Sequence, residues 1–342
     1  MNEKRGFVLG GTLIVDWVKI VDMYPREGTL AYILSSSRGI GGCPTNNSIN
    51  LKVLDPDLPV AVIGCIGDDE DGQYILEELR CREIDTASIR VSQTHPTAYT
   101  DVMTVQGTGQ RTFFHDRGAN SEWSFADIPF ERFKGYKIAQ IGYILLLDRM
   151  DAEDAEYGTV MAKAFARFQE MGLKTAVDVV SENSDRFARL VIPALKYVDY
   201  LILNEFEAGQ TVGIELRDPI GVLQGCRLRE TAEKLLLSGN SELVVIHMPE
   251  GGYALTRSGE EVKVPSYLLT EKEIRGTVGA GDAFCSGVLY GLEQNSSLTD
   301  CLQLGSMLAA CNLFSPTATG GALALENVRE KMQHYTQRSL VF

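Results

Sequence analysis

The sequence has few basic residues, no basic run and no long apolar run, and each absence narrows what the protein can do. Its 32 basic residues stand against 46 acidic ones, and the net charge of −14 disfavours binding to nucleic acid or to an anionic membrane. No stretch of about 18 apolar residues could span a bilayer, and the N-terminal MNEKRGFVLGG has no apolar signal-peptide segment. We therefore expect a cytoplasmic protein that binds neither nucleic acid nor membrane.

The common signatures of disulfide, zinc and nucleotide-loop proteins are also missing. The seven cysteines are odd in number and include no C-x-x-C pair, so reduced thiols are the simplest interpretation. The four histidines are not spaced as metal ligands. The sequence contains no Gly-Lys dipeptide, no G-x-S-x-G and no H-E-x-x-H, which excludes a Walker A loop, a hydrolase nucleophile elbow and a zinc-protease helix.

What the chain does contain is a regular alternation of short apolar runs with amphipathic stretches. Buried apolar strands separated by helices are typical of an α/β fold whose mostly parallel sheet is covered on both faces. The predicted strands are Gly6–Leu9, Val60–Ile63, Ile138–Ile141, Thr175–Val179, Tyr200–Leu203 and Leu243–His247. The predicted helices are Thr45–Val53, Glu70–Arg82, Glu153–Glu170, Leu228–Ser238, Ala280–Leu292, Leu298–Phe314 and Glu326–Gln337.

Two regions interrupt this alternation. Leu13–Ser37 and Thr97–Arg117 are rich in β-branched and aromatic residues, contain Gly or Pro turns and show no helical period, so we predict inserted antiparallel hairpins. A small β layer made by these hairpins would cover the crevice at the strand ends, where open α/β sheets bind ligands. Surface hairpins without a function are the alternative.

Three small residues precede Asp282 at the start of a predicted helix. Gly279, Ala280 and Gly281 leave their backbone N–H groups open to a ligand, and a helix N-terminus attracts phosphate or a developing anion. Asp282 follows in the first turn, where a carboxylate could accept the proton of an alcohol that attacks phosphorus. The alternative is an acid that the helix dipole alone favours at this position.

A second glycine-rich stretch, RGIGGCPTNN, fails the dinucleotide fingerprint because the third glycine is absent. Gly41 and Gly42 predict a close approach of the backbone, and Asn46 either caps the following helix or hydrogen-bonds a polyol hydroxyl. Asp16, in an apolar stretch, either faces solvent or is held by partners such as sugar hydroxyls. Arg111, in the second hairpin, is either an edge-strand charge or a group that reaches a charged substrate.

Polar residues also follow the predicted strand Tyr200–Leu203, and α/β folds place their chemistry at the C-terminal ends of strands. Asn204 and Glu207 lie one helical turn apart. They could hold a hydrated Mg²⁺ through water, or they could form an Asn cap with first-turn acids.

Together, the order and spacing of these motifs resemble the ribokinase-like (PfkB-type) carbohydrate kinase family over nearly the whole chain. The resemblance implies a three-layer α/β/α ribokinase-like fold with a mostly parallel central sheet. It further implies a single domain over residues 1–342, with a small β-sheet lid from insertions at about 13–37 and 97–117. The matching positions are Gly41, Gly42 and Asn46; Gly279–Asp282; Asn204 and Glu207; Asp16; and G-x-R-x-F at Gly109, Arg111 and Phe113.

The activity that the resemblance implies is ATP-dependent phosphoryl transfer to a sugar hydroxyl. By this resemblance Asp282 is the base, Gly279–Gly281 form an anion hole, and Asn204 and Glu207 organise Mg²⁺ and the phosphates. An exposed β lid could also pair two subunits into a homodimer. The resemblance also implies that the sugar is bound by Asp16, Gly41, Gly42, Asn46 and Arg111. It implies that the nucleotide is bound by Gly252 and Thr277, and that the adenine pocket is bordered by the helix Leu302–Phe314 and the following SPTATGGAL.

Three positions depart from the family pattern. Gly276 stands where the family usually has Asp near a monovalent-cation site, which leaves potassium dependence open. The stretch HMPEGG, ending at Gly252, replaces T-x-G-x-x-G and has Pro249 at the first glycine. Cys43 stands where ribokinases and phosphosugar kinases often have Lys, which resembles the fructokinase and ketosugar branch.

Two other functions fit the same motifs. A nucleoside kinase of this family would stack a base between lid aromatics such as Tyr99, Phe113 or Phe114. A catalytically silent sugar-binding protein would keep the fold, but the retention of Asp282 with its glycines argues against it. A dinucleotide oxidoreductase is disfavoured by the missing fingerprint.

Overall fold

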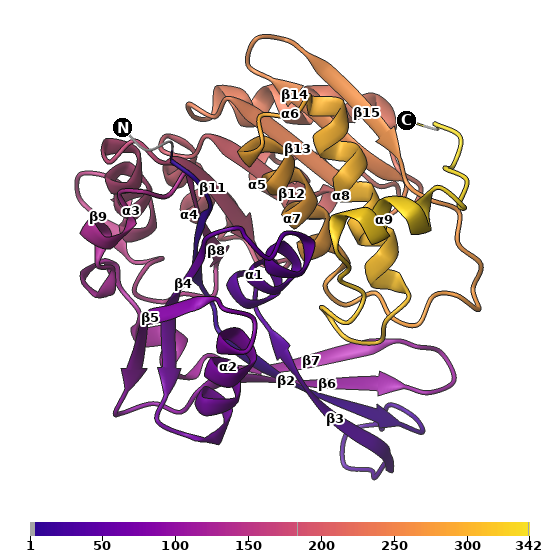
Figure 1. The fold of residues 1–342 in the computed structure, drawn as a ribbon. Helices are drawn as coiled ribbons and strands as arrows, with labels where there is room; N and C mark the ends of the chain where they lie inside the picture. The colour runs from indigo at the N-terminus through magenta and orange to yellow at the C-terminus, as the bar shows by residue number, and fades with distance from the viewer. Residues whose placement is uncertain (1–3, 183, 341) are drawn as a thin grey trace.

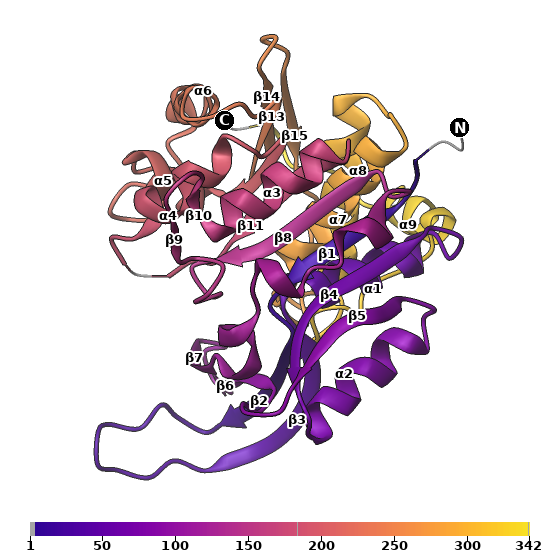
Figure 2. The same ribbon diagram turned by 90° about the vertical axis from the view of Figure 1, so that its left-hand side faces the viewer.

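The computed structural model describes residues 4–182, 184–340 and 342. At its centre lies a nine-stranded sheet of order β15-β14-β13-β12-β11-β8-β1-β4-β5 (Figures 1 and 2). Neighbouring strands from β13 to β5 are parallel, and β14 and β15 extend the edge in antiparallel fashion. The strands are β1 Phe7–Gly11, β4 Val60–Gly67, β5 Asp85–Ser92, β8 Ile138–Ile144, β11 Lys174–Val179, β12 Tyr200–Asn204, β13 Leu243–Met248, β14 Gly251–Thr256 and β15 Glu261–Pro265.

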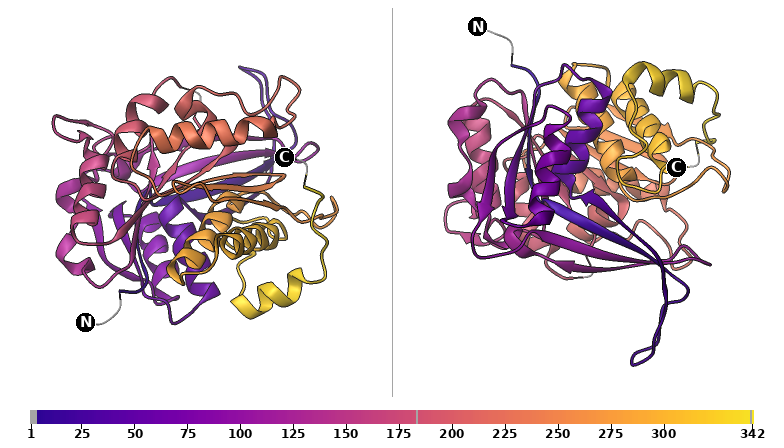
Figure 3. Two further views of the ribbon diagram at one scale, coloured as in Figure 1. Left: turned by 90° about the horizontal axis from the view of Figure 1, so that it is seen from above. Right: turned by 60° about the horizontal axis from the view of Figure 1, so that its bottom comes forward.

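Helices cover both faces of this sheet (Figure 3), and the strands between them are accordingly apolar runs, such as the fully buried VAVIGCIG of β4. The predicted three-layer fold is confirmed. One face of the sheet is covered by α1 Cys43–Leu54, α7 Ala280–Glu293 and α8 Leu298–Leu313, and α9 Leu325–Met332 packs against α8. The other face is covered by α3 Val160–Glu170, α4 Phe187–Leu195, α5 Glu205–Val212 and α6 Leu228–Leu237. The remaining helix, α2 Glu70–Arg80, lies beside β5.

The two predicted hairpins join into a second sheet of order β3-β2-β6-β7, which projects from the end of the main sheet at the bottom of Figure 1. Its strands are β2 Ile14–Val21, β3 Ile33–Gly41, β6 Ala98–Val105 and β7 Arg111–Asp116. One face of this small sheet is held against α2. There Trp17 Nε1 donates to Asp71 Oδ2 at 3.3 Å, and the Arg38 guanidinium lies 4.0 Å from the centre of the Tyr74 ring.

The predicted helix Glu153–Glu170 is wrong in its first part. β9 Glu153–Asp154 and β10 Gly158–Thr159 form a short hairpin there, and α3 begins only at Val160. The reason is local, because Gly158 has a φ of +89° and the Thr159 side chain caps α3 by accepting from the Ala162 N–H at 3.1 Å.

At the other end of the chain, α9 stops at Met332, five residues before the predicted Gln337. The residues after it pair with the main body instead: Leu268 N donates to Thr336 O at 2.9 Å and Arg338 N donates to Ser266 O at 2.8 Å. All seven cysteines are free thiols. Among the described residues, no helix is both long and apolar enough to cross a membrane.

Candidate active site

The C-terminal ends of five neighbouring strands bring polar side chains to one edge of the main sheet. Thr12 follows β1, Tyr143 stands near the end of β8, Asp178 near the end of β11, Asn204 ends β12 and His247 lies near the end of β13. Because the five strands are parallel neighbours, these residues lie along one edge of the sheet, where α/β folds place their binding crevice. We call this region, with the adjoining N-terminus of α7 and the start of the small sheet, the crevice.

Asp282 lies in this crevice, in the first turn of α7. Gly279 is the N-cap of this helix; its φ is +75° and a Cβ there would stand 2.3 Å from Ala318 O, so any other residue would be strained. Asp282 is buried and accepts two hydrogen bonds, from Asn46 Nδ2 at 2.9 Å and from Tyr143 OH at 3.2 Å. Burial raises the pKa of Asp282 to about 6, and the two hydrogen bonds oppose that rise.

Other acids surround Asp282. Burial, with the nearby charge of Asp282, raises the pKa of Asp16 to about 6. The pKa of Asp178 is raised well above its usual value by burial and by the charges of Glu207 and Asp282. The ligand atoms of Asp178, Asp282 and Cys43 lie within 4.8 Å of one another, and burial raises the pKa of the Cys43 thiol, so this sulfur stays protonated.

The two glycines before α1 bring the backbone against Asp16 and Thr12. A Cβ on Gly41 would stand 2.5 Å from Asp16 Oδ2, and a Cβ on Gly42, whose φ is +91°, would stand 2.0 Å from Thr12 O. Gly42 is the N-cap of α1, so Asn46 lies inside the helix and its side chain is directed to Asp282.

Asn204 and Glu207 form a capping box at the start of α5. The Asn204 side chain accepts from Glu207 N at 2.9 Å, and Glu207 Oε2 accepts from Asn204 N at 3.0 Å. Ser181 Oγ also donates to Glu207 Oε1 at 2.7 Å, and burial raises the pKa of Glu207 to about 7. The structure thus shows the Asn cap with first-turn acids, one of the two interpretations of this pair, and the magnesium interpretation stays a prediction.

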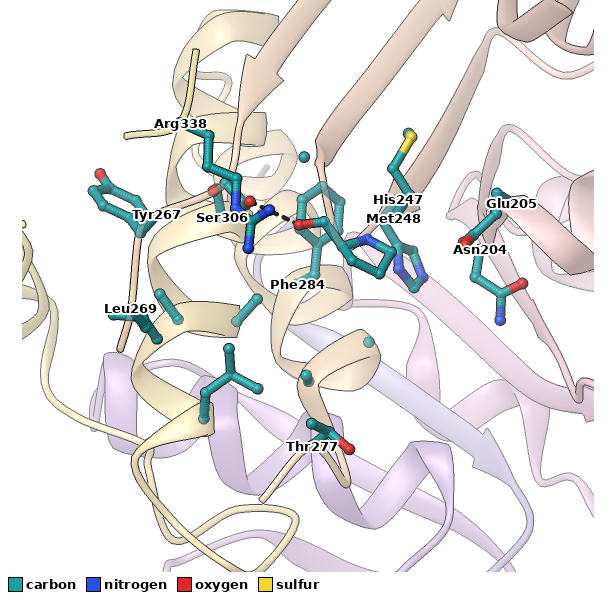
Figure 4. A pocket seen from close by; sticks show the side chains of 18 of the residues that line it. Asn204, Glu205, His247, Met248, Tyr267, Leu269, Thr277, Phe284, Ser306 and Arg338 are labelled. Carbon is teal, nitrogen blue, oxygen red and sulfur yellow. Dashed lines mark hydrogen bonds between the residues drawn. The ribbon is translucent and has the colours of Figure 1, made fainter. Parts of the chain in front are cut away.

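A cavity of about 510 Å³ opens beside α7 (Figure 4). Asn204, Thr277, Ala280 and Gly281 are among its lining residues. Its other walls are mostly apolar. They come from α7, α8, the β13–β14 turn and the segments after β15 and α9: Met248, Pro249, Gly251, Tyr267, Leu269, Ile274, Phe284, Ala309, Ala310 and Leu313, with Ser306 and Arg338.

Two residues near this cavity differ from expectation. Gly252 is not among the lining residues; a Cβ there would stand 2.7 Å from the Phe284 ring, so its smallness makes room for that ring. His247 lines the cavity beside Gly281, and burial lowers its pKa to about 4, which keeps the imidazole neutral at pH 7.

Arg111 lies farther out on the small sheet. It pairs with Thr104 across the β6–β7 ladder, whereas Asp16 pairs with Thr100, four residues earlier on β6. The register therefore places Arg111 on the same face as Asp16 but roughly 13 Å along the strands.

Thr12, Tyr143, Asp178 and His247 were not among the predicted site residues. His247 ends a predicted apolar strand and Tyr143 follows one by two residues, so the signal that singled out Asn204 could have found both. Asp178 lies within the predicted strand Thr175–Val179 and Thr12 three residues beyond Leu9, where that signal is weaker.

Comparison with known proteins gives consistent results. The pfkB family carbohydrate kinase model matches residues 7–323. The chain is 27% identical over 352 residues to the 5-dehydro-2-deoxygluconokinase of Bacillus subtilis, covering 97% of this chain and 98% of that protein. The fold is similar to that of a ribokinase from Thermotoga maritima, with a TM-score of 0.78 at 18% identity over 96% of this chain and 99% of that one. It is also similar to an Arabidopsis thaliana ribokinase complexed with ribose and ATP, with a TM-score of 0.76 at 17% identity over 96% and 98% of the two chains.

Proposed function

The chain belongs to the pfkB family of carbohydrate kinases, and we propose that it transfers the γ-phosphate of ATP to a hydroxyl of a small sugar, with Asp282 as the general base. One observation carries the proposal. Asp282 is buried between two parts of the crevice, the cavity that Ala280 and Gly281 line and the polar surroundings of Asn46 and Asp16. A carboxylate at this junction can accept the proton of a hydroxyl while phosphate lies at the N-terminus of α7.

The nucleotide is proposed to occupy the 510 Å³ cavity. Its apolar walls suit a purine base. Among the described residues, the N–H groups of Gly279 and Gly281 have no hydrogen-bond partner, and they suit the transferring phosphate together with the helix dipole. Thr277 lies beside these groups on the cavity wall. The Arabidopsis ribokinase of the same fold was solved with ribose and ATP, which supports nucleotide binding here. This assignment makes Gly279–Gly281 the anion hole.

The sugar is proposed to lie on the other side of Asp282, held by Asp16, Asn46 and Thr12 and by the backbone at Gly41–Gly42. Among the described residues, Asn46 Oδ1 and Thr12 Oγ1 are buried and have no hydrogen-bond partner. Buried oxygens of this kind are normally satisfied, and sugar hydroxyls would satisfy both. Arg111 would reach the sugar only if the small sheet moved toward the crevice, because it lies far along the strands from Asp16.

The acids of the crevice fit a Mg²⁺ ion held through water. Burial raises the pKa of Asp178 and of Glu207, and the charge of Asp282 adds to both rises, so a divalent cation nearby would favour the charged forms of these acids. Asn204 and Glu207 already bond each other, so their contact to the metal would be through water, and the thiol of Cys43 is a poor ligand for Mg²⁺. When bound, Mg²⁺ would neutralise charge on the phosphates.

The whole chain is proposed to be one kinase domain in which the small sheet acts as a lid that keeps water from the crevice. The register of that sheet also bears on the nucleoside alternative. Phe113 shares the face of Asp16, whereas Tyr99 and Phe114 lie on the opposite face, so these aromatics cannot enclose a base between them. This arrangement favours a sugar over a nucleoside as the acceptor.

A panel of acceptors tests the proposal. The purified protein is incubated with Mg·ATP and, one at a time, hexoses, pentoses, sugar acids, sugar monophosphates and nucleosides, and ADP and phosphorylated product are both quantified. We expect a sugar for which one phosphomonoester forms per ADP. Phosphorylation of nucleosides alone would favour the alternative, and ADP release without a phosphorylated acceptor would contradict phosphoryl transfer.

A further inference from the structure

The segment after α9, residues 335–340, contributes Arg338 to the wall of the cavity that is proposed to bind ATP. It runs antiparallel to the residues after β15, where Tyr267 and Gln337 form an isolated bridge. Leu268 N donates to Thr336 O, and Arg338 N donates to Ser266 O. Gln337 Nε2 adds bonds to Gln303 Oε1 at 3.0 Å and Pro265 O at 3.3 Å. We call this segment the strap; it lies beyond residues 7–323, which match the family.

The strap places one positively charged side chain, that of Arg338, in the cavity wall. Figure 4 shows the Arg338 side chain beside Ser306 and Tyr267, at the end of the cavity away from Thr277. The neighbouring acid, Glu250, is held by Arg217 through two hydrogen bonds of 3.0 and 2.9 Å. The charge of Arg338 still helps to lower the pKa of Glu250, but among the described residues no hydrogen bond or ion pair occupies the Arg338 guanidinium, which leaves its donors to a ligand.

Arg338 lies beside Ser306 of α8 (Figure 4), and the place of Ser306 along that helix indicates which part of a nucleotide Arg338 would contact. Leu313, at the C-terminal end of α8, accepts from Arg275 N, and the neighbouring Asn312 Nδ2 donates to Val278 O, so this end lies beside the anion hole. Ser306 stands seven residues earlier, a rise of about 10 Å along the helix. A nucleoside triphosphate whose γ-phosphate lies at Gly281 would thus have its base near Ser306 and Arg338.

We propose that Arg338 binds the base of the nucleotide, with its planar guanidinium against the purine, and that the strap is part of the nucleotide site. This inference rests on the proposed use of ATP. A guanidinium is suited to such a contact because it stacks on π faces and donates hydrogen bonds to ring nitrogens in the same plane. Most of the other lining residues, such as Leu269, Ile274 and Phe284, are apolar and would exclude water from the base.

The test compares three ligands that share different parts of ATP: adenosine, ADP and inorganic tripolyphosphate. Their dissociation constants are measured by calorimetry for the wild type and for Arg338→Ala, with Arg329→Ala as the control for a lost positive charge, since Arg329 is exposed on α9 outside the cavity. We expect Arg338→Ala to weaken adenosine and ADP by a similar factor of about 5 to 30, with tripolyphosphate changed less than twofold. Arg338→Lys keeps the charge but not the planar group, so it should recover little of the loss.

Two results would overturn the inference. One is unchanged adenosine and ADP binding in Arg338→Ala; the other is a loss confined to ADP and tripolyphosphate that Arg338→Lys restores, which would show a phosphate contact. If the wild type binds neither adenosine nor ADP, the proposed use of ATP fails as well, so the two failures are distinguishable.

The strap itself is tested by a double-mutant cycle. Gln337→Ala removes the bonds to Gln303 and Pro265 and should weaken adenosine binding about two- to fivefold by loosening Arg338. In the Arg338→Ala background the same change should have no further effect. Equal effects in both backgrounds would contradict positioning by the strap.

Discussion

Removing the hydroxyl of Tyr143 should move the acid limb of the pH profile to higher pH. Tyr143 OH donates to Asp282 Oδ1 at 3.2 Å, and this bond lowers a pKa that burial has raised to about 6. The base must be deprotonated to act, so kcat/KM falls as the pH drops through this pKa. Tyr143→Phe removes a bond that favours the carboxylate, so its activity should be lost at a higher pH than that of the wild type.

The size of this change follows from the bond. Hydrogen bonds to charged groups contribute about 1.5–3 kcal/mol, and the 3.2 Å separation places this one near the weaker end. Since about 1.4 kcal/mol corresponds to one pH unit, the limb should move up by about one unit. Asp16 and Asp178 titrate with Asp282, so the measured value belongs to the group of acids rather than to one residue.

The assay is kcat/KM between pH 5 and 9, with ADP quantified directly so that no coupling enzyme limits the rate. Tyr136→Phe is the matched control, because Tyr136 is half-buried against Phe133 outside the crevice. An acid limb that stays in place or moves to lower pH in Tyr143→Phe would refute the reasoning. A wild-type limb near pH 4 would also refute it, because Asp282 would then titrate as an ordinary carboxylate.

Two further predictions concern the sugar and the metal. Gly41→Ala would place a methyl group 2.5 Å from Asp16 Oδ2 and displace that carboxylate. Steady-state kinetics should therefore show at least a tenfold higher KM for the sugar, with the KM for ATP within twofold of the wild type. Equal effects on both KM values would indicate general misfolding instead. Removing divalent cations with EDTA should abolish phosphoryl transfer, and added Mg²⁺ should restore it. The Glu207→Gln variant should need several-fold more Mg²⁺ than the wild type for its half-maximal rate. Full turnover in EDTA would contradict the metal requirement.

The elements that periodicity specifies were predicted well, and those fixed by long-range contacts were not. β13 and β12 are apolar runs in a doubly covered sheet, so their residues alone indicate strands. β15, with the pattern EVKVP, carries too little apolar periodicity and depends on pairing with β14. α9 ends early because the strap finds partners near Ser266, and no local signal announces such pairing.

The site shows the same division. Gly279 and Gly42 were found because each adopts a backbone conformation that favours glycine, and the sequence shows glycine directly. Tyr143 was not, because nothing near it in the sequence reveals that its hydroxyl meets an acid 139 residues away. Arg338 is a similar case: an arginine in a polar tail has no local signal, and only the strap carries it to the cavity.

The most direct test of the central claim, that Asp282 is the base, is the turnover of Asp282→Asn with ligand binding measured on the same sample. The control is Asp300→Asn, which removes an exposed acid from the first turn of the neighbouring helix α8. Asp300 interacts with a helix dipole but lies outside the crevice, so only the loss of a catalytic base should lower turnover. We predict that kcat of Asp282→Asn falls by about 10²- to 10⁴-fold while the dissociation constants for ADP and sugar stay within about threefold, and that Asp300→Asn retains wild-type turnover. A kcat for Asp282→Asn within tenfold of the wild type would contradict the account.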